Sequence, residues 1–162
     1  MSMARHSMRG FTLIELLVVM TVMGVMLGLA VPSFSNFIAS QRAKTVAYDL
    51  TTAFVLARSE AVKRNANVTV APALATDWTQ GWSVMAGATT LQQQQAFSGV
   101  TITKAASAAA LPSSFVYGPS GRMTSGSGTQ YLQINGPAYS GFTKCVKIDT
   151  TGIPSTKSVA CP

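Results

Sequence analysis

The sequence is poor in charge. Only 10% of its 162 residues are Asp, Glu, Lys or Arg, and the formal net charge is +7. Low charge combined with many Ala, Ser, Thr, Gly and Gln residues is not typical of a cytosolic helical enzyme, and it favours a β-rich module outside the cytoplasm. The excess of basic residues is mild, and it does not form a dense nucleic-acid-binding patch.

Histidine is almost absent. The single one, His6, lies in a short polar segment at the N-terminus, so the remaining chain lacks a Ser-His-Asp or Cys-His site and histidine-bound zinc. The sequence has no phosphate-binding glycine loop, because Gly126–Gly128 lies between two predicted strands and reads as a hairpin turn. We therefore predict no enzymatic activity, no cofactor and no metal. Nothing in the spacing pairs the four acidic residues after Ser33: Asp49, Glu60, Asp77 and Asp149.

Cysteine is also scarce. Cys145 and Cys161 show no C-x-x-C spacing, which argues against zinc or thioredoxin chemistry. In an exported chain they predict one disulfide that closes a loop of about 16 residues and stabilises the fold by about 3 kcal/mol. The alternative is a pair of free or otherwise paired thiols.

One long apolar run stands out against this background. Phe11–Val31 follows a short basic segment, and its 21 residues would span about 31 Å as a helix, the thickness of a bilayer core. Glu15 is the only charged residue in the run. Gly24 and Gly28 form a small-xxx-small pair that would let another helix approach, although such pairs also arise by chance in apolar runs.

The helical pattern continues beyond Pro32. Because the apolar spacing resumes directly, the proline predicts a kink rather than the end of the helix. We expect one helix from Phe11 to Asn65, whose second half needs a domain to cover its apolar stripe. The stripe consists of Phe34, Phe37, Ile38, Val46, Leu50, Phe54, Ala57 and Ala61.

The composition changes after Asn65, where short alternating segments bounded by turn residues predict an antiparallel sheet covered by the helix. Leu91–Ala96 and Ala105–Ala110 are biased in composition and are interpreted as loops or strand edges, and Asp77 is placed in a turn. The predicted strands are Val68–Ala71, Gly81–Met85, Val100–Lys104, Ser114–Tyr117, Thr129–Ile134 and Phe142–Ile148.

The segment Gly10-Phe11-Thr12-Leu13-Ile14-Glu15 resembles the class III signal peptide of type IV pilins and type II secretion pseudopilins. The rest of the chain resembles the GspH/FimT family of minor pilins and pseudopilins, through Leu56–Asn65, Val68–Val70, Gly81-Trp82 and Ser120–Arg122. The resemblance implies an α+β, type IV pilin-like fold with a long N-terminal helix packed on a C-terminal antiparallel β domain. The expected parts are a leader (1–10), a transmembrane and assembly half of the helix (11–32), an amphipathic half (33–65) and a periplasmic β domain (66–162).

This resemblance also implies how the chain is processed, stored and assembled. A prepilin peptidase would cut between Gly10 and Phe11 and methylate the new Phe11 amine. The chain would then wait in the bacterial inner membrane, with its C-terminal domain in the periplasm, before an inner-membrane platform assembles it with other pilins through Glu15, Gly24, Gly28 and Pro32. One alternative is a conventional secretory signal with a cut after Ala30, but Glu15 would be unfavourable in it and the helical pattern continues from Pro32. The other is a plain membrane anchor, which would give Glu15 no function.

Cleavage would give Glu15 a counter-charge. The new amine of Phe11 is positive, and residues four apart lie on the same face of a helix. A carboxylate near the helix N-terminus also meets the positive end of the helix dipole. The carboxylate could pair with its own amine or with that of a neighbouring subunit, and the sequence leaves both open.

Three functions remain in competition. The first is a minor pilin at or near the tip of a type IV pilus that helps to start assembly, which Pro32 and the paired cysteines favour; the second is the H-type minor pseudopilin of a type II secretion system. The third is DNA capture, because some pilus-associated relatives bind DNA through a C-terminal Gly-Arg-x-Arg element. Here Thr151–Ser155 keeps the glycine but replaces both arginines. The basic residues left for that role are Arg122, Lys144, Lys147 and Lys157.

Overall fold

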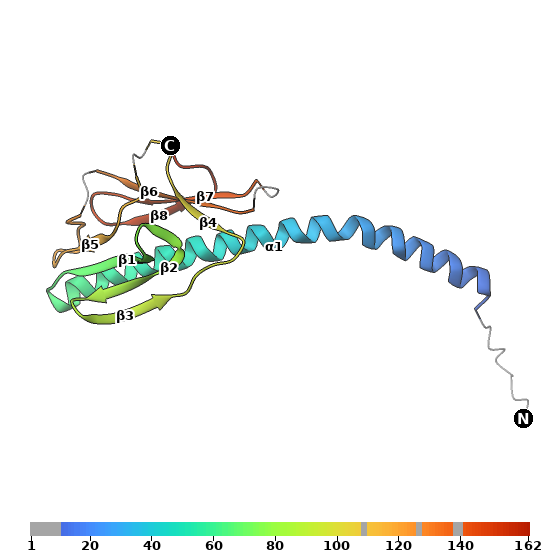
Figure 1. Cartoon of the computed structure of the whole chain (residues 1–162), viewed down its shortest axis with the longest axis horizontal. Coiled ribbons are helices and arrows are strands. Elements are labelled where there is room, and N and C mark those ends of the chain that lie inside the picture. The colour runs from blue at the N-terminus through green and yellow to red at the C-terminus, as the bar shows by residue number, and fades with distance from the viewer. Residues whose placement is uncertain (1–10, 108–109, 126–127, 138–140) are drawn as a thin grey trace, which may run out of the picture. The chain divides into compact units, whose positions relative to one another are not determined.

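The computed structural model describes residues 11–107, 110–125, 128–137 and 141–162, with the backbone alone for 29–33. Its elements follow the order of one helix and then eight strands (Figure 1). The chain divides into two compact units, Met1–Asn36 and Phe37–Pro162. The elements are α1 (Leu13–Arg64), β1 (Val68–Leu74), β2 (Asp77–Ala86), β3 (Thr89–Gln94), β4 (Thr101–Lys104), β5 (Phe115–Tyr117), β6 (Gln130–Asn135), β7 (Thr143–Ile148) and β8 (Pro154–Lys157).

The predicted single helix is confirmed. α1 runs from Leu13 to Arg64 and passes through Pro32 without a break in its assignment. It ends in a Schellman motif, in which Asn65 takes a positive φ of 49° and Ala66 N donates to Ala61 O at 3.2 Å. The helix therefore stops where the composition changes, because asparagine tolerates the left-handed conformation that closes a helix.

The apolar stripe of α1 begins later than predicted. Phe34 and Phe37 are 66% and 54% exposed, so these two members of the stripe do not join the core. Burial starts at Ala39, and many of the buried positions are alanines, whose small side chains let strands approach the helix closely. The fully or nearly fully buried positions of α1 are Ala39, Ala43, Val46, Ala47, Leu50, Ala53, Phe54, Ala57 and Ala61.

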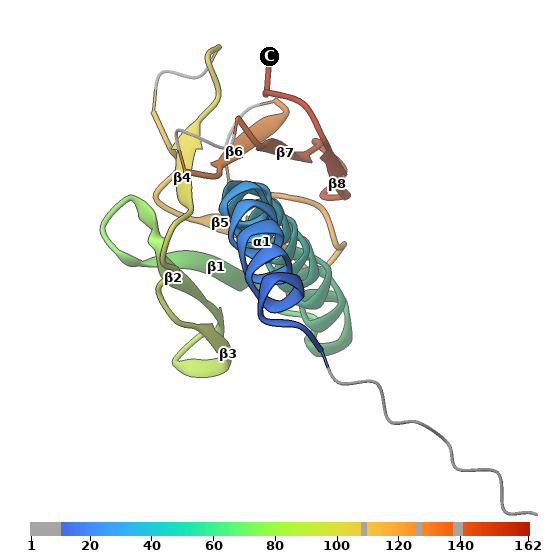
Figure 2. The same cartoon turned by 90° about the vertical axis from the view of Figure 1, so that its right-hand side faces the viewer.

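In its described residues, the β domain contains two four-stranded sheets rather than one. Sheet A has the order β3-β2-β1-β5 and sheet B the order β4-β6-β7-β8, and all pairs are antiparallel. In Figure 1 and in Figure 2, the strands β1–β3 and the strands β6–β8 lie on different sides of α1. One continuous core draws on the helix and on both sheets.

Two strands depart from the sequence prediction. β3 forms where Leu91–Ala96 was interpreted as a loop or strand edge, and β8 lies in a segment that was not predicted as a strand at all. Both are edge strands with mostly exposed or half-buried side chains, so neither needs the apolar alternation that identifies a strand in sequence. Asp77 begins β2 instead of lying in a turn. The predicted turn at Gly126–Gly128 falls partly outside the described residues.

An aromatic cluster joins α1 to sheet A. Phe54 is fully buried, and its ring centroid lies 5.0 Å from that of Phe115 in an edge-to-face arrangement. Trp78 and Tyr117 surround it at centroid distances of 6.4 and 6.5 Å. The Trp78 Nε1 donates to Pro112 O at 2.9 Å, so this large side chain is buried with its polar atom satisfied.

Cys145 and Cys161 form a disulfide in the structure. They pack with Ala105 and Tyr131 in a small second cluster, separate from the main core. Cys161 N also donates to Gln133 Oε1 at 3.2 Å, so the C-terminal residues are held against sheet B by a covalent bond and a hydrogen bond.

Replacing both cysteines by alanine is expected to lower the free energy of unfolding by about 3 kcal/mol, because the denatured chain regains the freedom of the loop. Urea titration with and without a reductant measures this difference. Reductant should destabilise the wild type by a similar amount and leave the double variant unchanged. An unchanged wild type under reducing conditions would contradict the prediction.

Burial of the Tyr117 phenol makes the stability of the fold depend on pH in the alkaline range. The phenol is fully buried and donates to Gly152 O at 3.1 Å. Gly152 is at a φ of 81°, and a Cβ there would lie only 2.7 Å from a Tyr117 ring carbon, so this turn requires glycine. Desolvation raises the pKa of Tyr117 well above its ordinary value.

The raised pKa of Tyr117 predicts a fall in stability at high pH. The folded state keeps the phenol protonated while the unfolded chain loses its proton above about pH 10, so stability is complete below that pH and declines as pH rises beyond it. Tyr117→Phe should flatten this decline between about pH 10 and 11 in urea titrations. Tyr48→Phe is the matched control, because Tyr48 is 73% exposed. Equal slopes in the two variants would refute the assignment.

Candidate functional site

The first turn of α1 is built around Thr12. Its Oγ1 accepts a hydrogen bond from Glu15 N at 3.3 Å, and its carbonyl accepts one from Leu16 N at 3.2 Å. Thr12 is thus the N-cap, and Glu15 occupies the third helical position, as in a capping box. The sequence analysis missed Thr12, although the Thr-x-x-Glu spacing carries this signal.

Glu15 is exposed and has no cation within ion-pair distance among the described residues. In the uncut chain the nitrogen of Phe11 belongs to a peptide bond, so its pairing with the carboxylate stays a prediction. The Phe11 side chain is 80% exposed. The first turn therefore presents an aromatic ring and, four residues later, a carboxylate, both free of contacts that would hold them within the chain.

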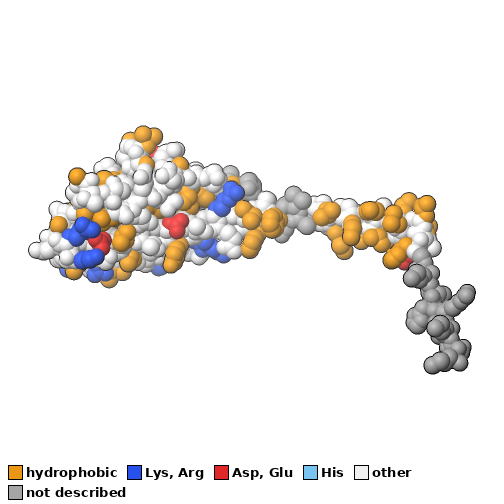
Figure 3. Space-filling model, turned by 90° about the horizontal axis from the view of Figure 1, so that it is seen from below, with side chains coloured by type: hydrophobic (Ala, Val, Ile, Leu, Met, Phe, Trp, Pro, Cys, Tyr) orange, Lys and Arg blue, Asp and Glu red, His pale blue; other side chains and the backbone are white. Residues whose placement is uncertain are grey.

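The remainder of the N-terminal unit exposes apolar side chains. Large hydrophobic residues from Leu13 to Leu27 are between 44% and 83% exposed, and they gather along α1 in Figure 3. Thr21 Oγ1 donates to Val18 O at 2.8 Å, so this hydroxyl is satisfied within the helix and tolerates apolar surroundings. Within the part of the chain that the structure describes, no helix meets the length and hydropathy that a membrane crossing requires.

The predicted assembly glycines leave room for a neighbour. A Cβ built on Gly24 or Gly28 meets no atom within 4 Å. Both positions are therefore open to close approach by another helix, and contact there stays a prediction. Pro32 lies within α1, and its side chain is outside the described set.

The basic residues considered for DNA binding do not gather on one face. In β7, Lys144 shares a face with the buried Val146, toward α1, whereas Lys147 shares the opposite face with Cys145. The β6–β7 register is regular, so no bulge brings the two lysines together. Lys157 is paired with Cys145 and therefore lies on the Lys147 side of sheet B.

Arg122 belongs to another part of the domain, in the turn after β5. Gly121 O in this turn accepts a hydrogen bond from Arg58 Nε at 3.0 Å, which connects it to the end of α1. The segment compared with Gly-Arg-x-Arg forms the turn before β8 and the first two residues of that strand, and Ile153 N donates to Asp149 Oδ1 at 3.0 Å. DNA binding stays a prediction that this arrangement of charges does not strengthen.

No catalytic or metal centre is found in the described part of the chain. No three residues among its His, Cys, Asp and Glu lie close enough together to hold a metal ion. The thiols are joined to each other, and Glu60 pairs with Arg64 at 2.6 Å, which lowers the pKa of the Glu60 carboxyl. Lys63 contributes to that shift from 3.4 Å.

Two models of known protein families match this chain. The family model for the type II transport protein GspH matches residues 46–152, more than half of the chain. The chain belongs to the GspH family. A second model, the prokaryotic N-terminal methylation motif, matches residues 5–31, which include the whole apolar run Phe11–Val31 and the six residues before it. This GspH-family chain is thus a type IV pilin-like minor pilin or pseudopilin, and the members of these families are structural subunits rather than enzymes.

Known proteins resemble the GspH-family chain in sequence and in fold. The pilin-like protein PilA1 of Thermus thermophilus is 49% identical over 61 residues, which cover 37% of each chain. The minor pilin FimU of Pseudomonas aeruginosa has a TM-score of 0.62 at 17% identity, covering 75% of this chain and 92% of FimU. The minor pseudopilin EpsH of Vibrio cholerae gives 0.51 at 14% identity, covering 74% and 97%. These likenesses confirm the predicted α+β, type IV pilin fold.

Proposed function

We propose that this GspH-family chain is a minor subunit at or near the tip of a type IV pilus, where it helps to start assembly. The observation that carries the proposal is the methylation motif at residues 5–31, which contains the start of a helix whose apolar side chains from Leu13 to Leu27 are uncovered. An exposed apolar surface of this extent requires a membrane or other subunits to cover it. A subunit that is stored in the membrane and then polymerised meets both requirements in turn.

The proposal includes the processing steps that the N-terminal methylation motif implies. A prepilin peptidase cuts between Gly10 and Phe11 and methylates the Phe11 amine, which remains positively charged. Thr12 caps α1 immediately after the cut and places Glu15 one turn from the new amine. The inner-membrane platform then lifts the chain out of the bilayer, and the helix packs against those of neighbouring pilins while the β domain lies in the periplasm.

Mass spectrometry of the mature protein tests this proposal. The expected N-terminus is a methylated Phe11, and Gly10→Val should abolish processing and leave the leader attached. Gly28→Val is the matched control, because it makes the same change at a glycine of α1 that lies away from the cut. A mature chain that begins at Met1, or at Val31 after a conventional cut, would overturn the proposal.

The alternative is the H-type minor pseudopilin of a type II secretion system. The description of the matching family and the likeness to EpsH support it, whereas PilA1, FimU and Pro32 support the pilus. Deleting the gene separates the two functions. Loss of surface pili with normal protein secretion identifies a pilus subunit, and the reverse identifies a pseudopilin.

A further inference from the structure

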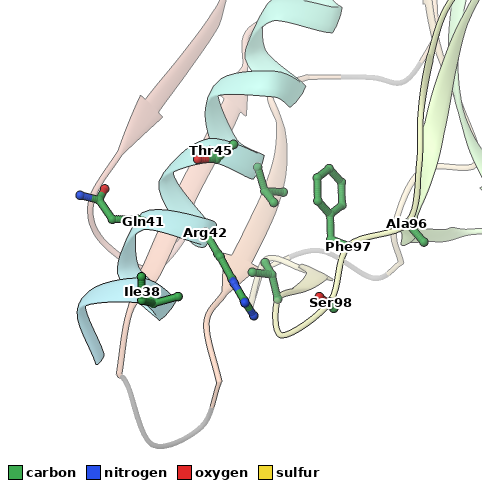
Figure 4. A pocket seen from close by; sticks show the side chains of 9 residues that line it. Ile38, Gln41, Arg42, Thr45, Ala96, Phe97 and Ser98 are labelled. Atoms are coloured by element: carbon green, nitrogen blue, oxygen red, sulfur yellow. The ribbon is translucent and has the colours of Figure 1, made fainter. Parts of the chain in front are cut away.

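An open groove lies beside α1 in the C-terminal unit. It has a volume of about 440 Å³ and is bounded by α1 and the segment between β3 and β4 (Figure 4). The Phe97 ring lies between its own segment and the helix, and its centroid is 5.3 Å from that of the buried Trp82. The core therefore holds an apolar wall in place at this surface. The apolar lining consists of Ile38, Val46, Phe97 and Val100.

Among the described residues, Arg42 is the only charged one that lines the groove. Its guanidinium reaches toward the β3–β4 segment, and a Cβ built on Gly99 would lie 3.1 Å from Arg42 Nη1. No carboxylate of the described chain lies within ion-pair distance of Arg42. The groove thus combines an apolar wall with one cation that lacks a counter-charge.

This part of α1 carries cations and no acid. Arg42 and Lys44 are the first charged residues after Glu15, and the next acid is Asp49. Lys44 lines a second hollow beside the helix, together with Lys144 of β7. The described residues that line the two hollows include no carboxylate. The surface around this stretch of helix therefore attracts anions.

The groove begins a short distance beyond the apolar run of α1. Ile38 lies seven residues after Val31, or about 10 Å along a helix, and the headgroup layer on each side of a bilayer core is about 5 to 8 Å thick. In Figure 4 the Arg42 side chain points back along α1 toward Ile38, the direction that helical side chains favour. Long basic side chains reach the headgroups in this way. If the apolar run fills the bilayer core, the guanidinium is within reach of lipid phosphates.

We propose that the groove holds the headgroup of an anionic phospholipid of the periplasmic leaflet while the chain is stored in the membrane. The phosphate accepts hydrogen bonds from the Arg42 guanidinium, whose planar fork of donors matches phosphate oxygens. The glycerol and the first acyl carbons cover the wall of Ile38 and Phe97. A phospholipid fits this lining better than an acidic peptide, because it joins an anionic head to an apolar body in one molecule. The contact rests on the proposed function, since only a membrane-stored chain presents the groove to headgroups.

Fluorescence quenching of the full-length chain in vesicles tests the contact. A dye on Ser98→Cys reports from the exposed rim of the groove, and a lipid with a nitroxide on its headgroup is the quencher; the described cysteines are joined in the disulfide and do not take the dye. Ser155→Cys is the matched control, because it adjoins Thr156, which hydrogen-bonds to Thr51, thirteen residues beyond Ile38 on α1.

The vesicles contain phosphatidylcholine alone or equal parts of phosphatidylcholine and phosphatidylglycerol. Anionic lipid should raise the ratio of quenched to unquenched dye at Ser98 about fivefold or more, and leave the ratio at Ser155 unchanged. Equal ratios at Ser98 in the two kinds of vesicle would overturn the proposal.

Replacing the cation tests its part in the contact. Arg42→Gln should lower the quenched ratio at Ser98 about fivefold in the anionic vesicles. Lys63→Gln is the matched control, because it removes an exposed cation from the last turn of the same helix, and it should leave the ratio unchanged. If Arg42→Gln left the quenching unchanged but removed the chain from filaments, the groove would belong to another subunit and the proposal would be refuted.

Two further measurements distinguish failure of this contact from failure of the proposed function. They are retention in the vesicles after an alkaline carbonate wash and the fraction of wild-type chain in sheared filaments. A retained and incorporated chain without quenching at Ser98 removes the groove contact and leaves the function intact. Quenching that depends on Arg42, in a chain absent from filaments, keeps the contact and removes the function. A chain that the wash releases refutes both.

Discussion

Replacing Glu15 by alanine is expected to remove the chain from filaments while leaving it in the membrane fraction. The substitution makes the run Phe11–Val31 free of charge, so insertion into a bilayer becomes easier. The variant lacks the Glu15 carboxylate that assembly is expected to use. The cation that would pair with this carboxylate in the packed filament therefore stays unpaired. Breaking a buried ion pair costs about 3 to 5 kcal/mol, which corresponds to more than a hundredfold loss of incorporation.

Quantitative immunoblots of membrane and sheared filament fractions measure this effect. Glu60→Ala is the matched control, because it removes a carboxylate from the same helix at a position where Lys63 and Arg64 are its partners. It should assemble normally. Normal incorporation of the Glu15→Ala protein would refute the pairing argument, whichever cation is the partner.

Phe54→Ala is expected to cause a large loss of stability, about 3 to 5 kcal/mol. The Phe54 side chain is fully buried among Trp78, Phe115 and Tyr117, so its removal leaves a cavity between α1 and sheet A. The rigid aromatic rings around it cannot collapse to fill the space. Since a domain of this size is stabilised by about 5 to 15 kcal/mol, the variant should unfold at a markedly lower urea concentration.

Urea titration of the unit Phe37–Pro162 measures this effect, because all the buried hydrophobic residues of the described chain belong to that unit. The neighbouring Val55 provides the control. Its side chain is 51% exposed, and Val55→Ala should change the free energy of unfolding by about 0.5 kcal/mol or less. Similar losses for the two variants would show that the aromatic cluster does not carry the contact between helix and sheet.

The helix was the most predictable element. Its apolar spacing, the composition change after Asn65 and the local closing motif all lie within one stretch of chain, and each is a short-range signal. The buried strands were also recognised, since one buried face imposes a period of two. β8 is missed and β3 is predicted only as a loop or strand edge, because an edge strand is set by hydrogen bonds to its neighbour rather than by its own side-chain pattern.

The candidate site also has parts that could be predicted from the sequence and parts that could not. The predicted cut site, the carboxylate of Glu15 and the apolar run are contiguous in sequence, and the methylation motif matches there. The groove beside Arg42 could not be predicted, because residues of α1 meet residues of the β3–β4 segment only through folding. The same holds for Arg58 and Gly121, two members of the matching family segments that are joined by a hydrogen bond across the fold.

The sequence alone determined the helix and the family, and it predicts a leader with a processing signal, because those properties reside in neighbouring residues. The tertiary structure decided that there are two sheets, that Phe34 and Phe37 remain exposed, and that Lys144 and Lys147 face opposite ways in a regular strand. It also showed that Thr12 caps the helix and that Arg42 lines an open groove. These outcomes depend on which segments pack together, since burial and pairing between distant residues are fixed only when the whole core forms.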